Sequence, residues 1–80
     1  MHEFGVLRQV TRTVNRIALE NRIPQVKHIA LDVGQTSGIV HQYLMKLFPV
    51  ARDEYDVLPT AELKLCTVPG SGLQIKEIGY

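Results

Sequence analysis

The stretch VKHIALDVGQTSGIVHQYLMKLFP, residues 26–49, decides the fold because its apolar repeat changes length half-way along. Apolar side chains first alternate with polar or small ones, which predicts a strand from Val26 to Val33. A turn rich in small polar residues follows, from Gly34 to Gly38. The repeat then lengthens to three and four residues, which predicts a helix from about Ile39 to Phe48 that kinks or restarts at Pro49. The side chains expected to face inward are Ile29, Leu31 and Val33 of the strand and Val40, Tyr43, Leu44, Leu47 and Phe48 of the helix.

The residues on either side of this stretch complete a small α+β pattern. Before it, an apolar stripe at helical spacing predicts a helix from Phe4 to Asn21. After it, a polar loop from Arg52 to Pro59 leads to two strands, Thr60–Val68 and Leu73–Ile78, joined by the short connector 69–72. The order is helix, strand, helix, strand, strand, so we expect two helices packed on one face of a three-stranded sheet.

Two details at the ends of these elements are also predicted. Thr36 or Ser37 is placed to cap the second helix by accepting a hydrogen bond from an amide of its first turn. Ile78 breaks the inward alternation of Leu73 and Ile75, so a bulge or the end of the strand is expected near it. In the strand before the connector, the expected inward residues are Ala61, Leu63 and Leu65.

The composition is that of one small globular domain. The chain has 80 residues, a hydrophobic fraction of 45% and a formal net charge of +1. No apolar run approaches the roughly 20 residues of a membrane helix, the first residues do not resemble a signal peptide, and the dispersed basic residues do not indicate a nucleic-acid partner. The single cysteine, Cys66, allows no internal disulfide, fits a reducing cytoplasm and excludes a zinc site made of two Cys-x-x-Cys pairs.

The remaining candidate chemistry lies at the first three residues. The sequence has no phosphate loop, nucleophile elbow or His-Glu-x-x-His pair, so no enzyme is predicted. The Met1 amine, the His2 amide and the His2 imidazole form one chelating arc, to which Glu3 adds an amide or a carboxylate. Ni(II) and Cu(II) favour square-planar nitrogen sites, and their binding releases protons. A histidine beside a chain start is ordinarily just an exposed residue, so the tripeptide alone does not decide between the two interpretations.

Four segments, spread over nearly the whole chain, share a resemblance to one protein family. They are Met1–Phe4, Leu31–Val40, Ala61–Leu65 and Ser71–Ile78. In sequence and in order they resemble the HypA/HybF family, the hydrogenase nickel-incorporation proteins. The resemblance implies delivery of nickel during maturation of nickel-iron hydrogenase and, in some organisms, of urease.

The resemblance also implies a site and partners. His2 is the implied essential nickel ligand, Met1 and Glu3 supply backbone nitrogens, and Glu3 also acts through its side chain. The implied partners are a nickel-handling GTPase and the hydrogenase large subunit, and the implied cargo is Ni(II).

The sequence departs from the family pattern at two places. The family carries a zinc domain with two Cys-x-x-Cys pairs before its last strand, where this chain has only residues 68–72, so no zinc is expected. Val40 stands where some relatives have an acidic residue proposed near the nickel, and a valine cannot bind a metal. His41 follows it but is turned by about 100° on a helix, so neither His41 nor His28 is predicted as a ligand.

The short connector leaves three questions open. Pro69–Gly72 suits either an engineered joint, in which the zinc domain has been removed, or a natural hairpin. It also suits a hinge through which the last strand is exchanged within a homodimer. The missing zinc domain and Val40 leave a second functional hypothesis, an interaction module that keeps the fold and no longer delivers metal.

Overall fold

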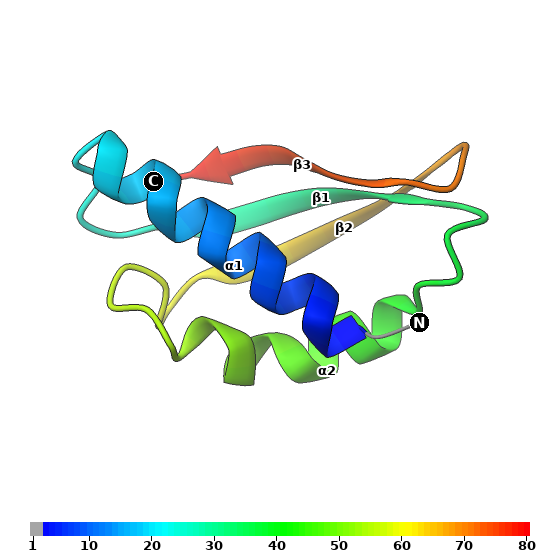
Figure 1. Ribbon diagram of the computed structural model, residues 1–80, viewed down its shortest axis with the longest axis horizontal. Helices are drawn as coiled ribbons and strands as arrows, with labels where there is room; N and C mark the ends of the chain where they lie inside the picture. Colours follow the sequence, from blue (N-terminus) through cyan, green and yellow to red (C-terminus); the bar gives the residue numbers. More distant parts are fainter. Residues whose placement is uncertain (1–2) are drawn as a thin grey trace.

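The computed structural model describes residues 3–80, which form two helices and three strands in the predicted order. The elements are α1 (Glu3–Glu20), β1 (His28–Gly34), α2 (His41–Arg52), β2 (Glu62–Val68) and β3 (Leu73–Gly79). Both helices lie on the same side of the sheet, and α1 crosses the strands diagonally (Figure 1). The predicted α+β architecture is therefore confirmed.

The sheet has the strand order β2-β1-β3, so β1 is the central strand. It pairs with β2 in parallel and with β3 in antiparallel orientation. Because β2 and β3 are not neighbours, the connector 69–72 must cross the end of β1, and the hairpin interpretation of this connector was wrong. Sequence spacing alone could not show this, since a short link between two strands normally joins strands that pair with each other.

The crossing holds the connector tightly against the end of β1. The Gly34 amide donates to the Gly72 carbonyl at 2.6 Å, and the Thr36 amide donates to the Gly70 carbonyl at 2.9 Å. A Cβ atom on Gly34 would lie 2.6 Å from both of these carbonyl oxygens. Only glycine therefore fits at this position, because the atoms that would clash belong to the main chain and cannot rotate away.

One continuous core lies between the helices and the sheet. The alternation read from the sequence is confirmed in β1, whose inward side chains are almost completely buried, and α1 presents an apolar stripe to them. Burial of each such side chain stabilises the fold by roughly 1.5–3 kcal/mol relative to exposure. The central members of this core are Leu7, Val10, Val14, Ala18, Ile29, Leu31, Val33, Leu44, Phe48 and Ala51.

The second helix differs from its prediction in length. Pro49 lies inside α2, which ends at Arg52 and does not restart after Phe48. Proline removes one helical hydrogen bond, but Phe48 and Ala51 on either side of it are buried, and this packing keeps the last turn helical. Arg52 adds a further contact, because its Nη1 donates to the Ala61 carbonyl at 2.6 Å.

The buried stripe of α2 also differs from its prediction. Val40 is 42% exposed and Tyr43 is 52% exposed, so both were wrongly assigned to the core. The fully buried positions are Leu44, Phe48 and Ala51, at steps of four and three. Since α2 is apolar around much of its circumference, its sequence alone could not fix which side faces the sheet.

The irregularity expected near the end of the chain is confirmed as a bulge. Ala30 pairs with Glu77 and Leu31 with Ile75, so Lys76 is an extra residue in β3. The extra residue returns Ile78 to the inward face, where it pairs with Ile29.

Candidate metal centre

Of the three predicted nickel ligands, only Glu3 belongs to the described part of the chain. Met1 and His2 lie outside residues 3–80. Glu3 is the first residue of α1, and it is 9% exposed, unusually buried for a glutamate. The part of the candidate site that the structure describes is therefore Glu3 and its neighbours.

The Glu3 carboxylate joins the starts of the two helices. The Val40 amide donates a hydrogen bond to Glu3 Oε2 at 3.1 Å, and Val40 is the N-terminal cap residue of α2. Figure 1 shows the first turn of α1 and the first turn of α2 at the same end of the molecule. The positive ends of both helix dipoles meet at this carboxylate, and each favours a negative charge by about 0.3–1 kcal/mol.

The capping role predicted for Thr36 or Ser37 was wrong. The cap residue of α2 is Val40, which makes no capping hydrogen bond through its side chain. The Ser37 hydroxyl accepts a hydrogen bond from the Ile39 amide at 3.2 Å, ahead of the helix, and the Thr36 hydroxyl donates to the Gly70 carbonyl at 2.9 Å. Glu3 lies 37 residues before Val40, so no local pattern could have revealed this contact.

The two histidines in the described chain occupy different ends of the fold. His41 is the first residue of α2, directly after Val40, and is half-buried. His28 begins β1 beside Gly79, at the end of the strand away from the connector. The structure therefore brings His41, and not His28, near Glu3.

His28 has a partner of its own. Its Nε2 lies 2.8 Å from Glu77 Oε2, and the contact is an ion pair when the imidazole is protonated. The hydrogen bond from His28 and the charge of its ring lower the pKa of Glu77 from its ordinary value of 4.5. This exposed pair belongs to the sheet and not to the candidate metal centre.

The side chains of residues 3–80 do not by themselves form a metal-binding site. Within that range, no three His, Cys, Asp or Glu side chains gather closely enough to hold an ion. Cys66, the only cysteine, is exposed on the face of β2 turned away from the helices, in register with Asp32 of β1. A site built from backbone nitrogens at the chain start would not show as such a cluster, since its donors are mostly main-chain atoms.

Comparison with known proteins decides the family. The family model for HypA, described as a hydrogenase/urease nickel-incorporation metallochaperone, matches residues 1–73. The chain belongs to the HypA family. This family is described as one of metallochaperones that act in nickel incorporation.

Solved structures agree with the fold of the HypA family. The solution structure of the Ni metallochaperone HypA from Helicobacter pylori matches with a TM-score of 0.79 and 18% sequence identity, over 96% of this chain and 72% of that one. A second solution structure, of a HypA protein, matches with a TM-score of 0.72 and 18% identity, over 96% and 71% of the two chains. No curated protein matches the chain. In the described range, no helix is both long enough and apolar enough to cross a membrane.

Proposed function

We propose that this chain binds Ni(II) through Met1, His2 and Glu3 and delivers it during maturation of nickel-iron hydrogenase. Membership of the HypA family is the observation that carries the proposal. An amine, two amides and an imidazole are a donor set that square-planar Ni(II) favours. The helical ladder makes no use of the first amides of a helix, so binding of a metal at the Glu3 amide would leave the hydrogen bonds of α1 intact.

The surroundings of Glu3 support a nickel site beside the start of α2. The 3.1 Å hydrogen bond from the Val40 amide holds the Glu3 side chain against the second helix. A metal bound by the two preceding residues would therefore sit close to Val40 and His41. The Glu3 carboxylate orients the chain start in this account, while the nitrogen atoms bind the metal.

The proposal extends to the setting in which the protein works. We assign the whole chain to one nickel-binding domain without zinc and with no catalytic step of its own. Its partners are a nickel-handling GTPase and the hydrogenase large subunit, and its compartment is the cytoplasm. A homodimer made by exchange of β3 belongs to the same proposal; light scattering over a range of concentrations tests it, and a strict monomer rules it out.

Titration of untagged protein with Ni(II) tests the proposed site. One equivalent should bind near neutral pH, and affinity should fall in acid because binding releases protons. His2→Ala should abolish binding, and so should a short extension before Met1, because it removes the amine from the chelate. His28→Ala is the matched control and should bind as the wild type does. Unchanged binding by His2→Ala would show that the metal is held elsewhere.

A second candidate function rests on the short connector and on Val40. The chain has only residues 69–72 between β2 and β3, and the exposed Val40 side chain offers no donor beside Glu3. In this alternative the protein is an interaction module that docks on hydrogenase-maturation partners without delivering metal. His2→Ala would then leave docking unchanged in a pull-down from hydrogenase-producing cells, and absence of any partner there would count against the idea.

A further inference from the structure

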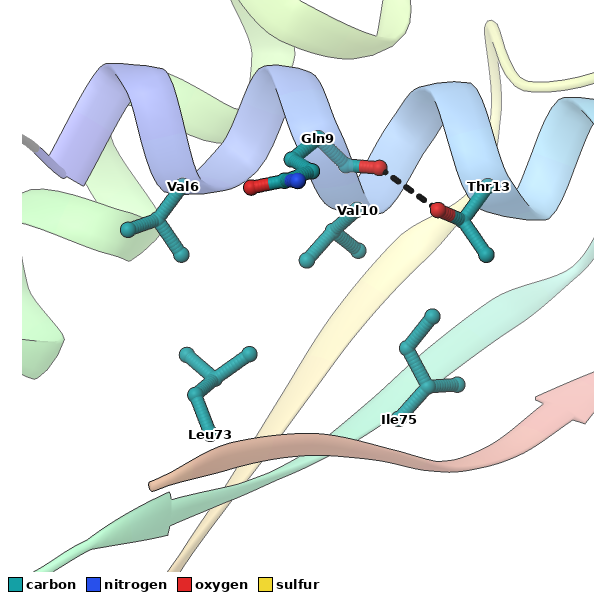
Figure 2. A pocket seen from close by; sticks show the side chains of 6 residues that line it. All are labelled: Val6, Gln9, Val10, Thr13, Leu73 and Ile75. Carbon is teal, nitrogen blue, oxygen red and sulfur yellow. Dashed lines mark hydrogen bonds between the residues drawn. The ribbon is translucent and has the colours of Figure 1, made fainter. Parts of the chain in front are cut away.

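An apolar groove runs between α1 and the edge of the sheet. Figure 2 shows Val6 and Val10 pointing from α1 toward Leu73 and Ile75, which point back from β3. The groove has a volume of about 360 Å³, and Gln9 and Thr13 form its polar side along the helix. It is separate from the Glu3–Val40 contact, since none of its lining residues takes part in that contact.

The groove exists because β3 is an edge strand. On the helix side of the sheet, the side chains of the central strand β1 are covered, and Leu31 is 0% exposed. Leu73 and Ile75 of β3 face the same way but remain half-buried, as does Val6 opposite them. Among residues 3–80, no strand lies beyond β3 in the sheet, so this apolar area stays open to a partner.

A positively charged hollow adjoins the groove along α1. It is lined by Gly5, Arg8, Gln9 and Arg12, and it shares Gln9 with the groove. Arg8 forms an ion pair in which its Nε lies 3.7 Å from Glu54 Oε1, whereas Arg12 forms no ion pair with any of residues 3–80. A carboxylate would fit this hollow, because guanidinium groups bind carboxylates in a fixed, two-pronged geometry.

The occupant is not an added strand. Lys76 forms a bulge in β3, and a bulge together with a lysine on an edge strand are features that discourage edge-to-edge pairing. The two valines of α1 are instead spaced by four residues, one helical turn, and the polar pair Gln9 and Thr13 repeats the same step. A groove with this repeat matches a helix laid along it, with apolar side chains one turn apart.

A second copy of this chain also fits poorly. The exposed helix surfaces of this protein offer no apolar row flanked by acids, because α2 has no acidic residue. The acidic residues of α1 are Glu3, which is buried, and Glu20, whose Oε2 forms an ion pair with Arg16 Nη1 at 3.9 Å. The positive charge of the hollow therefore favours a partner with acidic residues beside its apolar side chains. The helices of this chain do not present such a surface.

We propose that the groove between α1 and β3 binds an amphipathic helix of another protein. Its apolar side chains fill the space between Val6, Val10 and Ile75, and a glutamate or aspartate beside them reaches over Gln9 to Arg12. The inference does not depend on nickel binding, since the groove and the hollow use residues outside the proposed metal site.

The probe for this site is a synthetic helical peptide of about five turns, with leucines along one face and glutamates beside them. The control peptide has lysines in place of the glutamates. Amide NMR spectra of the full chain should show shifts at the groove residues with the acidic peptide and weaker ones with the basic peptide. Arg12→Glu should weaken binding of the acidic peptide about tenfold and reverse the preference between the peptides. Lys64→Glu makes the same charge change on the opposite face of the sheet and should bind as the wild type does.

Three results would overturn the inference. Equal binding of both peptides would show that charge does not select the partner. Unchanged binding by Arg12→Glu would show that the hollow does not contribute to binding. Groove shifts that grow with protein concentration in the absence of peptide would show that a second copy is the occupant. His2→Ala should bind the acidic peptide as the wild type does, so failure of the nickel proposal leaves this test intact.

Discussion

The two ends of β1 differ in what packs against them. At one end, the Gly34 amide donates to the Gly72 carbonyl at 2.6 Å, and main-chain atoms fill the space that a Cβ atom on Gly34 would need. At the other, the Lys27 amide donates to the Gly79 carbonyl at 2.7 Å, but the space beside Gly79 is filled by the side chain of His28, which contacts the exposed Glu77. The starts of both helices lie toward the Gly34 end (Figure 1). The metal site is thus proposed toward the end of β1 where main-chain atoms, and not a side chain that can rotate, fill the space beside the glycine.

Substitution of Gly34 should have the largest effect on this comparison. In Gly34→Ala the new methyl group meets two carbonyl oxygens at 2.6 Å and an amide nitrogen at 2.7 Å, all of the main chain. The connector must move away from β1, and we expect a loss of about 3 kcal/mol in the free energy of unfolding. Urea unfolding monitored by circular dichroism measures it.

The matched control is Gly79→Ala at the opposite end. The three atoms nearest to a methyl group there all belong to the imidazole of His28, which can rotate away from Glu77. We expect a loss below about 1 kcal/mol, because an exposed ion pair contributes little. Equal losses in the two variants would remove the contrast between the two ends.

Removal of the Glu3 side chain should have the next largest effect. Glu3→Ala leaves the Val40 amide without its carboxylate acceptor, and a hydrogen bond to a charged group contributes about 1.5–3 kcal/mol. Glu20→Ala, at the other end of α1, removes only an exposed pair with Arg16 and should cost below about 0.5 kcal/mol. Thermal unfolding of both variants compares them, and a Glu3→Ala variant as stable as Glu20→Ala would contradict the role given to the carboxylate.

A smaller effect of opposite sign is expected at the cap of α2. Val40 has extended backbone angles, φ −95° and ψ 116°, which suit a cap residue, but its side chain cannot accept a hydrogen bond. Val40→Ser supplies an acceptor for an amide of the first turn and should stabilise the protein by about 1 kcal/mol. Val40→Ala, which adds no acceptor, is the control, and a shared melting temperature would contradict the prediction.

The smallest effect concerns the pH dependence of the His28 end. Because His28 lowers the pKa of Glu77 below 4.5 in the folded protein, the pair stabilises the fold above that pH. This contribution is lost as the pH falls through the lowered pKa, where the carboxylate becomes protonated. NMR titration of the Glu77 carboxyl group should give a pKa below 4.5 in the wild type and closer to 4.5 in His28→Ala. The same pKa in both proteins would assign the shift to another cause.

Much of this fold could be predicted because its elements have strong local patterns. The inward alternation of Ile29, Leu31 and Val33 marks β1, and the apolar stripe of α1 has a single clear side. The broken alternation at Ile78 indicated the bulge that the structure places at Lys76. Each of these signals lies within a few residues of the feature that it predicts.

The errors arose where distant residues decide the outcome. Pro49 stays helical because Phe48 and Ala51 reach the core, and the connector crosses β1 because β3 pairs on its far side. At the candidate site, the family resemblance singled out Glu3 and the neighbourhood of Val40. Their hydrogen bond spans 37 residues and follows only from the packing of the two helices.

Amide NMR spectra of the untagged protein with one equivalent of Ni(II) test the central claim most directly. The account predicts that nickel shifts or broadens the signals of Glu3, Phe4, Val40 and His41 and leaves those of His28 and Glu77 unchanged. In His2→Ala the same addition should change none of them. Nickel effects centred on His28 or Cys66, or effects at Val40 that persist in His2→Ala, would contradict a nickel site at the start of the chain.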